Sequence, residues 1–133
     1  MTQRHDSLDF DLFKNEKARS TDNDLDLICR PKQIFDTNKV NVLFKSVAPK
    51  RTELVSLLKK LKSSGFEKIS LELTKKPLNA RKAVTSYAFL TDCLVKATWD
   101  FATKIQFPTY NPTDAEKLSV ISVGGYGRRE MAP

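Results

Sequence analysis

The sequence predicts a mainly α-helical fold, in which a helical hairpin is followed by one strand and a glycine-rich turn. Apolar residues recur at steps of three and four through residues 49–110, the spacing that places them on one face of a helix. A short apolar run from Leu118 to Val123 then leads into Gly124-Gly125-Tyr126-Gly127, which is typical of a strand that ends in a tight turn. Since a single strand cannot form a stable sheet, we expect an incomplete domain.

Composition divides the chain into three expected segments. Residues 1–48 mix charges densely and show no sustained period, so we expect a weakly ordered or loosely docked amino-terminal arm. Within this arm, Ile34-Phe35 and Val40 to Phe44 are apolar enough to form short docking segments. Residues 49–110 form the hairpin, and residues 111–133 form the strand and the glycine-rich turn of a truncated domain.

The two antiparallel helices of the hairpin are expected on either side of Pro77. The first begins near Pro49 and continues through Gly65, because its apolar stripe does so and a glycine inside a helix costs only about 1 kcal/mol. The second runs from Ala80 to about Gln106. Its apolar stripe repeats at steps of three and four: Val84, Tyr87, Thr91, Leu94, Thr98, Phe101 and Ile105. Further residues broaden this stripe: Ala83, Ala88, Leu90, Val95, Ala97 and Ala102.

The net charge of +7 is unevenly distributed, because residues 1–48 are neutral overall and residues 49–133 carry the whole excess. Such a basic half suits a nucleotide triphosphate or the acidic patch of a protein partner. Its lysines and arginines are not interleaved with exposed aromatic residues, as a nucleic-acid stacking platform requires. We therefore do not expect nucleic acid to be a partner.

Several common functional classes are excluded by what the sequence lacks. His5 is the one histidine, so a Ser-His-Asp triad or a histidine metal site cannot be built with it at a chain terminus. Cys29 and Cys93 lie far apart in dissimilar surroundings, which argues against a disulfide framework. No apolar run approaches a membrane span of about 18 residues, and no signal-peptide core is present. We therefore expect a cytoplasmic protein that does not bind a membrane.

The glycine-rich turn is the candidate functional site. Glycine has no Cβ, so Gly124, Gly125 and Gly127 allow backbone N–H groups to approach a ligand closely. Turns of this kind can hold phosphate oxygens, and the guanidinium of Arg128 supplies a planar positive group beside them. By its glycines alone, however, such a turn is more often an ordinary connection between elements.

The complete string is more specific than its glycines. Residues Val123 to Arg128, with Glu130 and Pro133, resemble the opening of the nucleotidyltransferase motif of the bifunctional PII-protein uridylyltransferase/uridylyl-removing enzymes. That family belongs to the polymerase-β-like nucleotidyltransferase superfamily, and its motif runs Gly-Gly-Tyr-Gly-Arg-Gly-Glu-Leu-x-Pro. The present sequence departs from the motif at Arg129, where glycine is usual, and at Met131, where leucine is usual. The resemblance extends more loosely back to about Arg51.

The resemblance implies the start of an α/β nucleotidyltransferase domain and a known reaction. Enzymes of the family transfer UMP from UTP to the nitrogen-regulatory protein PII and release pyrophosphate. It also implies that Gly124, Gly125, Gly127 and Arg128 bind the nucleotide. In the family the motif continues to Ser-Asp-x-Asp, whose aspartates hold catalytic Mg²⁺; this sequence ends at Pro133, before those residues. We therefore expect no catalytic residue and no metal ligand within this chain, and no catalysis by the chain alone.

Two other interpretations remain open from the sequence. The chain could act as a non-catalytic helical interaction module, or be a remnant without catalysis. It could also belong to another nucleotidyltransferase family, such as the glutamine-synthetase adenylyltransferases. Those enzymes also place Gly-Gly after a strand, but they lack the continuation Tyr126-Gly127-Arg128.

Overall fold

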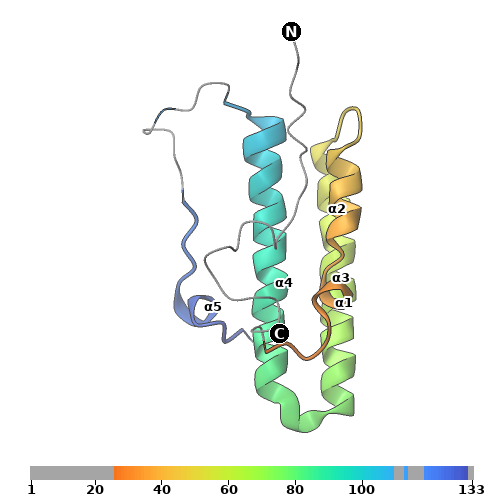
Figure 1. Cartoon of the computed structure of the whole chain (residues 1–133), viewed down its shortest axis with the longest axis vertical. Helices are drawn as coiled ribbons and strands as arrows, with labels where there is room; N and C mark the ends of the chain where they lie inside the picture. The colour runs from red at the N-terminus through yellow and green to blue at the C-terminus, as the bar shows by residue number, and fades with distance from the viewer. Residues whose placement is uncertain (1–25, 110–112, 114–118, 132–133) are drawn as a thin grey trace.

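The structure is a computed structural model that describes residues 26–109, 113 and 119–131 (Figure 1). The described part of the chain is mainly helical, as the sequence predicts. Two long helices dominate it, and shorter helical segments lie before and after them. In chain order the elements are α1 (Pro31–Ile34), α2 (Thr37–Phe44), α3 (Arg51–Lys75), the 3₁₀ turn η2 (Pro77–Asn79), α4 (Ala80–Phe101), the π-helical turn η3 (Ala102–Gln106) and α5 (Gly124–Gly127).

The predicted hairpin is confirmed: α3 and α4 lie side by side and antiparallel, joined by η2 (Figure 1). Helix α3 continues through Gly65, also as predicted. This glycine lies where the chain packs most closely. A Cβ added there would stand 2.6 Å from the carbonyl oxygen of Ile34 and 2.8 Å from a methyl carbon of Leu90. Glycine is therefore required in mid-helix because α1 and α4 both approach it.

The buried face of α4 agrees in part with the predicted stripe. Of the seven residues at steps of three and four, Tyr87 and Phe101 are buried, Thr98 is exposed and the others are partly buried. Of the residues that broaden the stripe, Ala83, Ala88, Leu90 and Ala97 are buried. The face that packs into the core combines small, aromatic and polar residues: Ala83, Ser86, Tyr87, Ala88, Phe89, Leu90, Cys93, Ala97, Asp100 and Phe101. The predicted stripe does not include these members of the buried face: Ser86, Phe89, Cys93 and Asp100.

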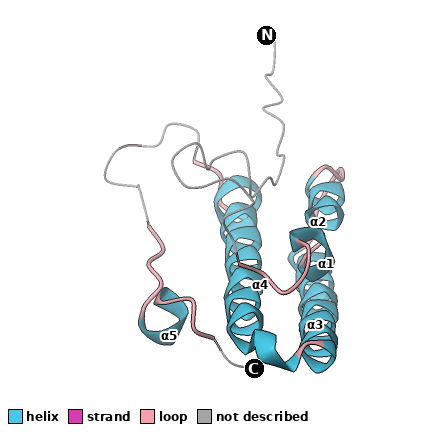
Figure 2. Cartoon of the chain, turned by 60° about the horizontal axis from the view of Figure 1, so that its bottom comes forward, coloured by secondary structure: helices cyan, strands magenta, loops and turns pink. Residues whose placement is uncertain are grey.

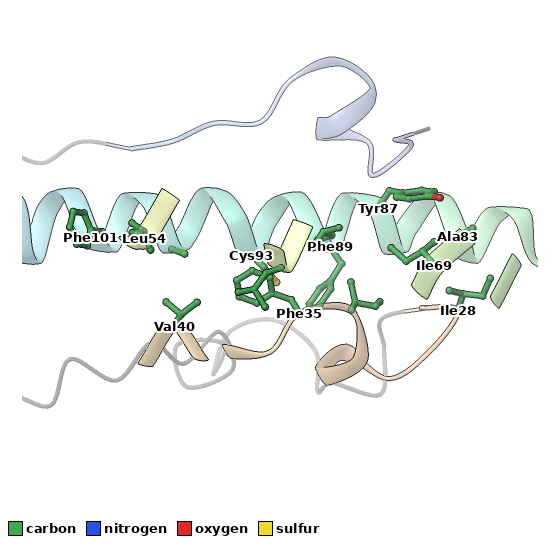
Figure 3. Packing of buried hydrophobic residues seen from close by; sticks show 14 of the residues in the cluster. Ile28, Phe35, Val40, Leu54, Ile69, Ala83, Tyr87, Phe89, Cys93 and Phe101 are labelled. Atoms are coloured by element: carbon green, nitrogen blue, oxygen red, sulfur yellow. The ribbon is translucent and has the colours of Figure 1, made fainter. Parts of the chain in front are cut away.

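Residues 26–44 pack against the hairpin. Helices α1 and α2 contact α3 (Figure 2), and the side chains of Phe35, Phe89 and Cys93 meet between α4 and this segment (Figure 3). The buried Ser86 hydroxyl accepts a hydrogen bond from the backbone N–H of Ile28 at 2.9 Å. The described part of the predicted arm is thus anchored in the core, which differs from loose docking, and the rest of the arm lies outside the described residues.

The predicted strand is not formed in the residues that the structure describes. Residues 119–123 follow an irregular path beside α4, and the side chains of Val120, Ile121 and Val123 are exposed. A strand needs a neighbouring strand for its backbone hydrogen bonds, and the described ranges contain no second extended segment that pairs with it. Leu118, the first residue of the predicted strand, lies outside the described residues.

Among the described helices, not one combines the length and the apolar character needed to cross a membrane. The two cysteines are unbridged, as predicted. Cys93 is fully buried in the core, where burial raises the pKa of its thiol, and Cys29 is partly buried with its pKa raised for the same reason.

Candidate functional site

The glycine-rich sequence folds into a single helical turn, α5, that lies alongside α4 (Figure 1). The N–H of Gly127 donates to the carbonyl of Val123 at 3.1 Å, and the N–H of Arg128 donates to that of Gly124 at 3.2 Å. The turn is closed by the N–H of Glu130, which donates to the carbonyl of Gly125 at 2.8 Å. These bonds use donors at the end of the turn, whereas the first N–H groups of a helix have no acceptor inside it.

Two of the glycines are required by the shape of this turn. Gly124 has a φ of +65°, a left-handed conformation that costs an L-residue roughly 1–2 kcal/mol. At Gly127 an added Cβ would stand 2.8 Å from the carbonyl oxygen of Ser122, closer than such atoms approach in practice. Gly125 is different, since an added Cβ there would be 3.4 Å from the carbonyl oxygen of Glu130, an ordinary contact.

Tyr126 fastens the turn to α4. Its hydroxyl donates a short hydrogen bond to a carboxylate oxygen of Asp92, in the middle of that helix. Partial burial raises the pKa of the Tyr126 phenol, and the Asp92 carboxylate raises it further. Asp92 was not among the residues predicted for the site, because a carboxylate on a helix carries no signal until its partner is known.

A cavity of about 280 Å³ lies between α4 and the segment that leads into the turn. Its walls combine apolar residues of both elements with the Asp92–Tyr126 pair. Val95 and Trp99 line it from α4, and Val120 lines it from the opposite side. The segment before the turn is therefore separated from α4 by this cavity, and the turn itself is joined to α4 at Tyr126.

The structure places Arg128 at the end of the turn and pairs it with Glu130. The guanidinium Nε lies 2.9 Å from a carboxylate oxygen of Glu130, and both side chains are mostly exposed, at 67% and 60%. The predicted nucleotide-binding residues Gly124, Gly125, Gly127 and Arg128 are thus brought together on one turn. A ligand that used Arg128 would compete with Glu130 for it.

Arg129 occupies the position at which the resembled motif has glycine. Its φ is +58°, and it is the one non-glycine residue of the described chain with a positive φ. Residues with a Cβ adopt this region rarely and at a cost. Arg129 thus replaces the glycine of the motif at a position whose backbone conformation glycine adopts more readily.

The described residues around the turn do not form a magnesium site. Mg²⁺ prefers several oxygen ligands, usually including carboxylates, and here the Asp92 carboxylate accepts from Tyr126 while that of Glu130 pairs with Arg128. Over the described part of the chain, no group of three or more His, Cys, Asp or Glu side chains is arranged to hold a metal ion.

Comparison with known proteins gives one consistent result. The chain is 30% identical over 109 residues to the bifunctional uridylyltransferase/uridylyl-removing enzyme of Erythrobacter litoralis. This match covers 78% of the present chain and 12% of that enzyme. It is 40% identical over 83 residues to the enzyme of the same name from Cereibacter sphaeroides, covering 62% of this chain and 9% of the relative. The enzyme from Ruegeria pomeroyi is 36% identical over 83 residues, with the same coverage.

The match is thus long relative to this chain and short relative to its relatives, of whose length it spans 9–12%. No family model matches the chain, and no solved structure matches it. The sequence relationship, together with the Gly-Gly-Tyr-Gly-Arg string that residues 124–128 carry, shows that the chain belongs to the family of bifunctional uridylyltransferase/uridylyl-removing enzymes.

Proposed function

We propose that this protein forms the amino-terminal part of a PII-protein uridylyltransferase and supplies the turn that binds UTP. The reaction is the transfer of UMP from UTP to PII with release of pyrophosphate, as part of nitrogen signalling in the cytoplasm. The observation that carries the proposal is the location of the related string: it forms a turn that is hydrogen-bonded to α4 through Tyr126 and Asp92.

Each predicted site residue has a proposed role in this turn. Gly124 and Gly125 present backbone N–H groups to the phosphate oxygens, which no side chain shields. Gly127 allows the turn to close against Ser122, where a Cβ would collide. Arg128 exchanges its exposed pairing with Glu130 for a bidentate contact with phosphate, a geometry that guanidinium groups favour.

Catalysis requires groups beyond those described here. Phosphoryl transfer to a protein hydroxyl relies on metal ions held by carboxylates that bridge them to the nucleotide. Two carboxylates near the turn in the described residues, Asp92 and Glu130, are engaged by Tyr126 and Arg128. We therefore propose that Mg²⁺ acts in the complete enzyme through carboxylates outside these 133 residues, and that this chain alone does not transfer UMP.

The proposal is tested by transfer of labelled UMP from UTP to PII in the presence of Mg²⁺. Two proteins are compared: the 133-residue chain, and a chimera in which residues 26–131 replace the matching stretch of a full-length relative. We expect no transfer by the chain alone and Mg²⁺-dependent transfer by the chimera. Labelling of PII by the isolated chain would contradict the proposed division of the site. A folded but inactive chimera would instead favour a non-catalytic helical interaction module.

A further inference from the structure

A second cavity, of about 490 Å³, lies on the other side of the glycine turn. It is formed by the first turns of α4, by the residues directly after α5 and by Asp26. Three arginines line it: Arg81 from α4, and Arg128 and Arg129 from the end of the glycine turn. Two carboxylates, those of Asp26 and Glu130, also face it. We call this cavity the arginine cleft.

The charges of the arginine cleft do not cancel. Glu130 is engaged by Arg128 at 2.9 Å, and Asp26 is engaged by Lys82, a residue outside the cleft lining, at 3.5 Å. Within the described residues, neither Arg81 nor Arg129 forms an ion pair with a carboxylate. Among the described residues, the cleft therefore holds two guanidinium groups that are not ion-paired with a carboxylate.

The backbone of Arg129 supplies a second, independent observation. Its φ of +58° is unfavourable for a residue with a Cβ, and residues held in such conformations cluster at functional sites. Glycine would relieve the strain, yet it would remove one of the two unbalanced charges. The presence of arginine at this position is accounted for if its side chain has a ligand.

We propose that Arg81 and Arg129 form an anion-binding pair in the arginine cleft that takes the phosphate chain of a nucleotide. This inference deepens the proposed function, because the cleft adjoins the turn that is proposed to bind UTP. It also adds Arg81, which comes from α4 and is not part of the glycine motif. Arg129 is a feature of this chain, since the resembled motif has glycine at this position.

The chemistry of the cleft fits a phosphate chain. Guanidinium groups donate two parallel hydrogen bonds to a phosphate and remain charged at every physiological pH. Two such groups, one from α4 and one from the end of the glycine turn, can contact different phosphates of one chain. A cation is a poor alternative, because both carboxylates of the cleft already have cationic partners.

The test is calorimetric titration of the whole 133-residue chain with inorganic tripolyphosphate, with UTP and with uridine. Arg81→Ala removes one member of the pair. Arg129→Asn removes the other and keeps a residue that tolerates the left-handed backbone. Lys59→Ala, an exposed residue of α3 outside the cleft, is the control for general loss of positive charge.

We expect tripolyphosphate and UTP to bind with one site per chain, and uridine not to bind. Arg81→Ala and Arg129→Asn should each raise the Kd for tripolyphosphate and for UTP about five- to tenfold. Lys59→Ala should change either Kd by less than about twofold. Equal weakening by Lys59→Ala, or the absence of binding at low salt, would overturn the inference. If tripolyphosphate binds but UTP does not, the two arginines form an anion site for a free polyphosphate, and the nucleotide assignment is wrong.

This test is independent of UMP transfer. If the transfer chimera is active and the isolated chain binds no polyphosphate, the arginine pair is wrong and the proposed function stands. If the chain binds tripolyphosphate through Arg81 and Arg129 but the chimera is inactive, the anion site stands and the proposed function is wrong.

Discussion

Replacing Gly65 with alanine should destabilise the fold, although alanine is the better helix former. The added Cβ would stand 2.6 Å from the carbonyl oxygen of Ile34 and within 2.9 Å of both methyl carbons of Leu90. Ordinary contact begins near 3.4 Å, so the backbone of α1 must retreat by 0.8 Å to reach it. Neither neighbour can yield by rotating into solvent, because Ile34 is 2% exposed and Leu90 is fully buried.

The magnitude follows from two opposing effects. Helix propensity favours alanine by about 0.8–1 kcal/mol, while overpacking a filled core costs typically about 1–3 kcal/mol. Retreat of α1 also weakens the contacts of the apolar residues that it carries. We expect a net loss of about 1–2 kcal/mol in the free energy of unfolding. For a helical unit of this size, that corresponds to a Tm lower by roughly 5–15 °C.

Thermal unfolding followed by far-UV circular dichroism measures this change. Ser64→Ala is the matched control, since Ser64 is the preceding residue of α3 and is exposed. That substitution should raise the free energy of unfolding by a few tenths of a kcal/mol through propensity alone. If Gly65→Ala melts at or above the unsubstituted protein, the close approach of α1 and α4 to this glycine is wrong.

Three further predictions concern the glycine turn. Gly127→Ala should expose the turn to tryptic cleavage after Arg128, because its Cβ would meet the carbonyl oxygen of Ser122 at 2.8 Å; an unchanged cleavage rate would refute this packing. Arg129→Gly should slow amide exchange in the turn about fivefold by removing roughly 1 kcal/mol of left-handed strain, and faster exchange would contradict it. Because the pKa of Tyr126 is raised on folding, its hydrogen bond to Asp92 should favour docking below about pH 10 and lose this effect as the pH rises further. Tyr126→Phe should abolish this pH dependence of the tryptic-cleavage rate. The same pH dependence in the variant would exclude the hydrogen bond.

The helical hairpin could be predicted because it depends on local pattern. The apolar stripe of α3 continues through Gly65, and the helix does the same. The reason for a glycine there could not be predicted, since it lies in the approach of Ile34 and Leu90 from elsewhere in the chain.

The two polar residues of the buried face of α4 could not be predicted from apolar periodicity. Ser86 is buried because the N–H of Ile28, 58 residues away in sequence, donates to its hydroxyl. Asp100 is 5% exposed and lies 3.4 Å from Lys96 and 3.6 Å from Lys104, which balance its charge. The partner of Ser86 is brought near only by the fold, whereas the lysines beside Asp100 are four residues away on the same helical segment and the burial of Asp100 depends on the packing of α4.

Only the part of the candidate site that depends on local sequence could be predicted. Gly124 and Gly127 mark a turn in any sequence, and the turn is present. The expected strand before it does not form in the described residues, since apolar β-branched residues specify a strand only where a partner strand exists. Asp92 and Arg81 could not be predicted as site residues, because they lie near the turn only in the folded chain, where α4 is beside it.

The central claim is that the glycine turn holds the nucleotide, and kcat/KM for UTP tests it most directly. The measurement uses the transfer chimera with and without Gly125→Val. Gly125 is the most suitable position, because an added Cβ makes only ordinary contact with Glu130, whereas Gly124 has a positive φ and a Cβ at Gly127 would meet Ser122. A branched side chain there blocks the approach of the phosphates, and loss of positioning costs phosphoryl transfer orders of magnitude. We predict that kcat/KM falls at least about 100-fold while the circular dichroism spectrum is unchanged. Near-normal transfer by the Gly125→Val chimera would contradict the account.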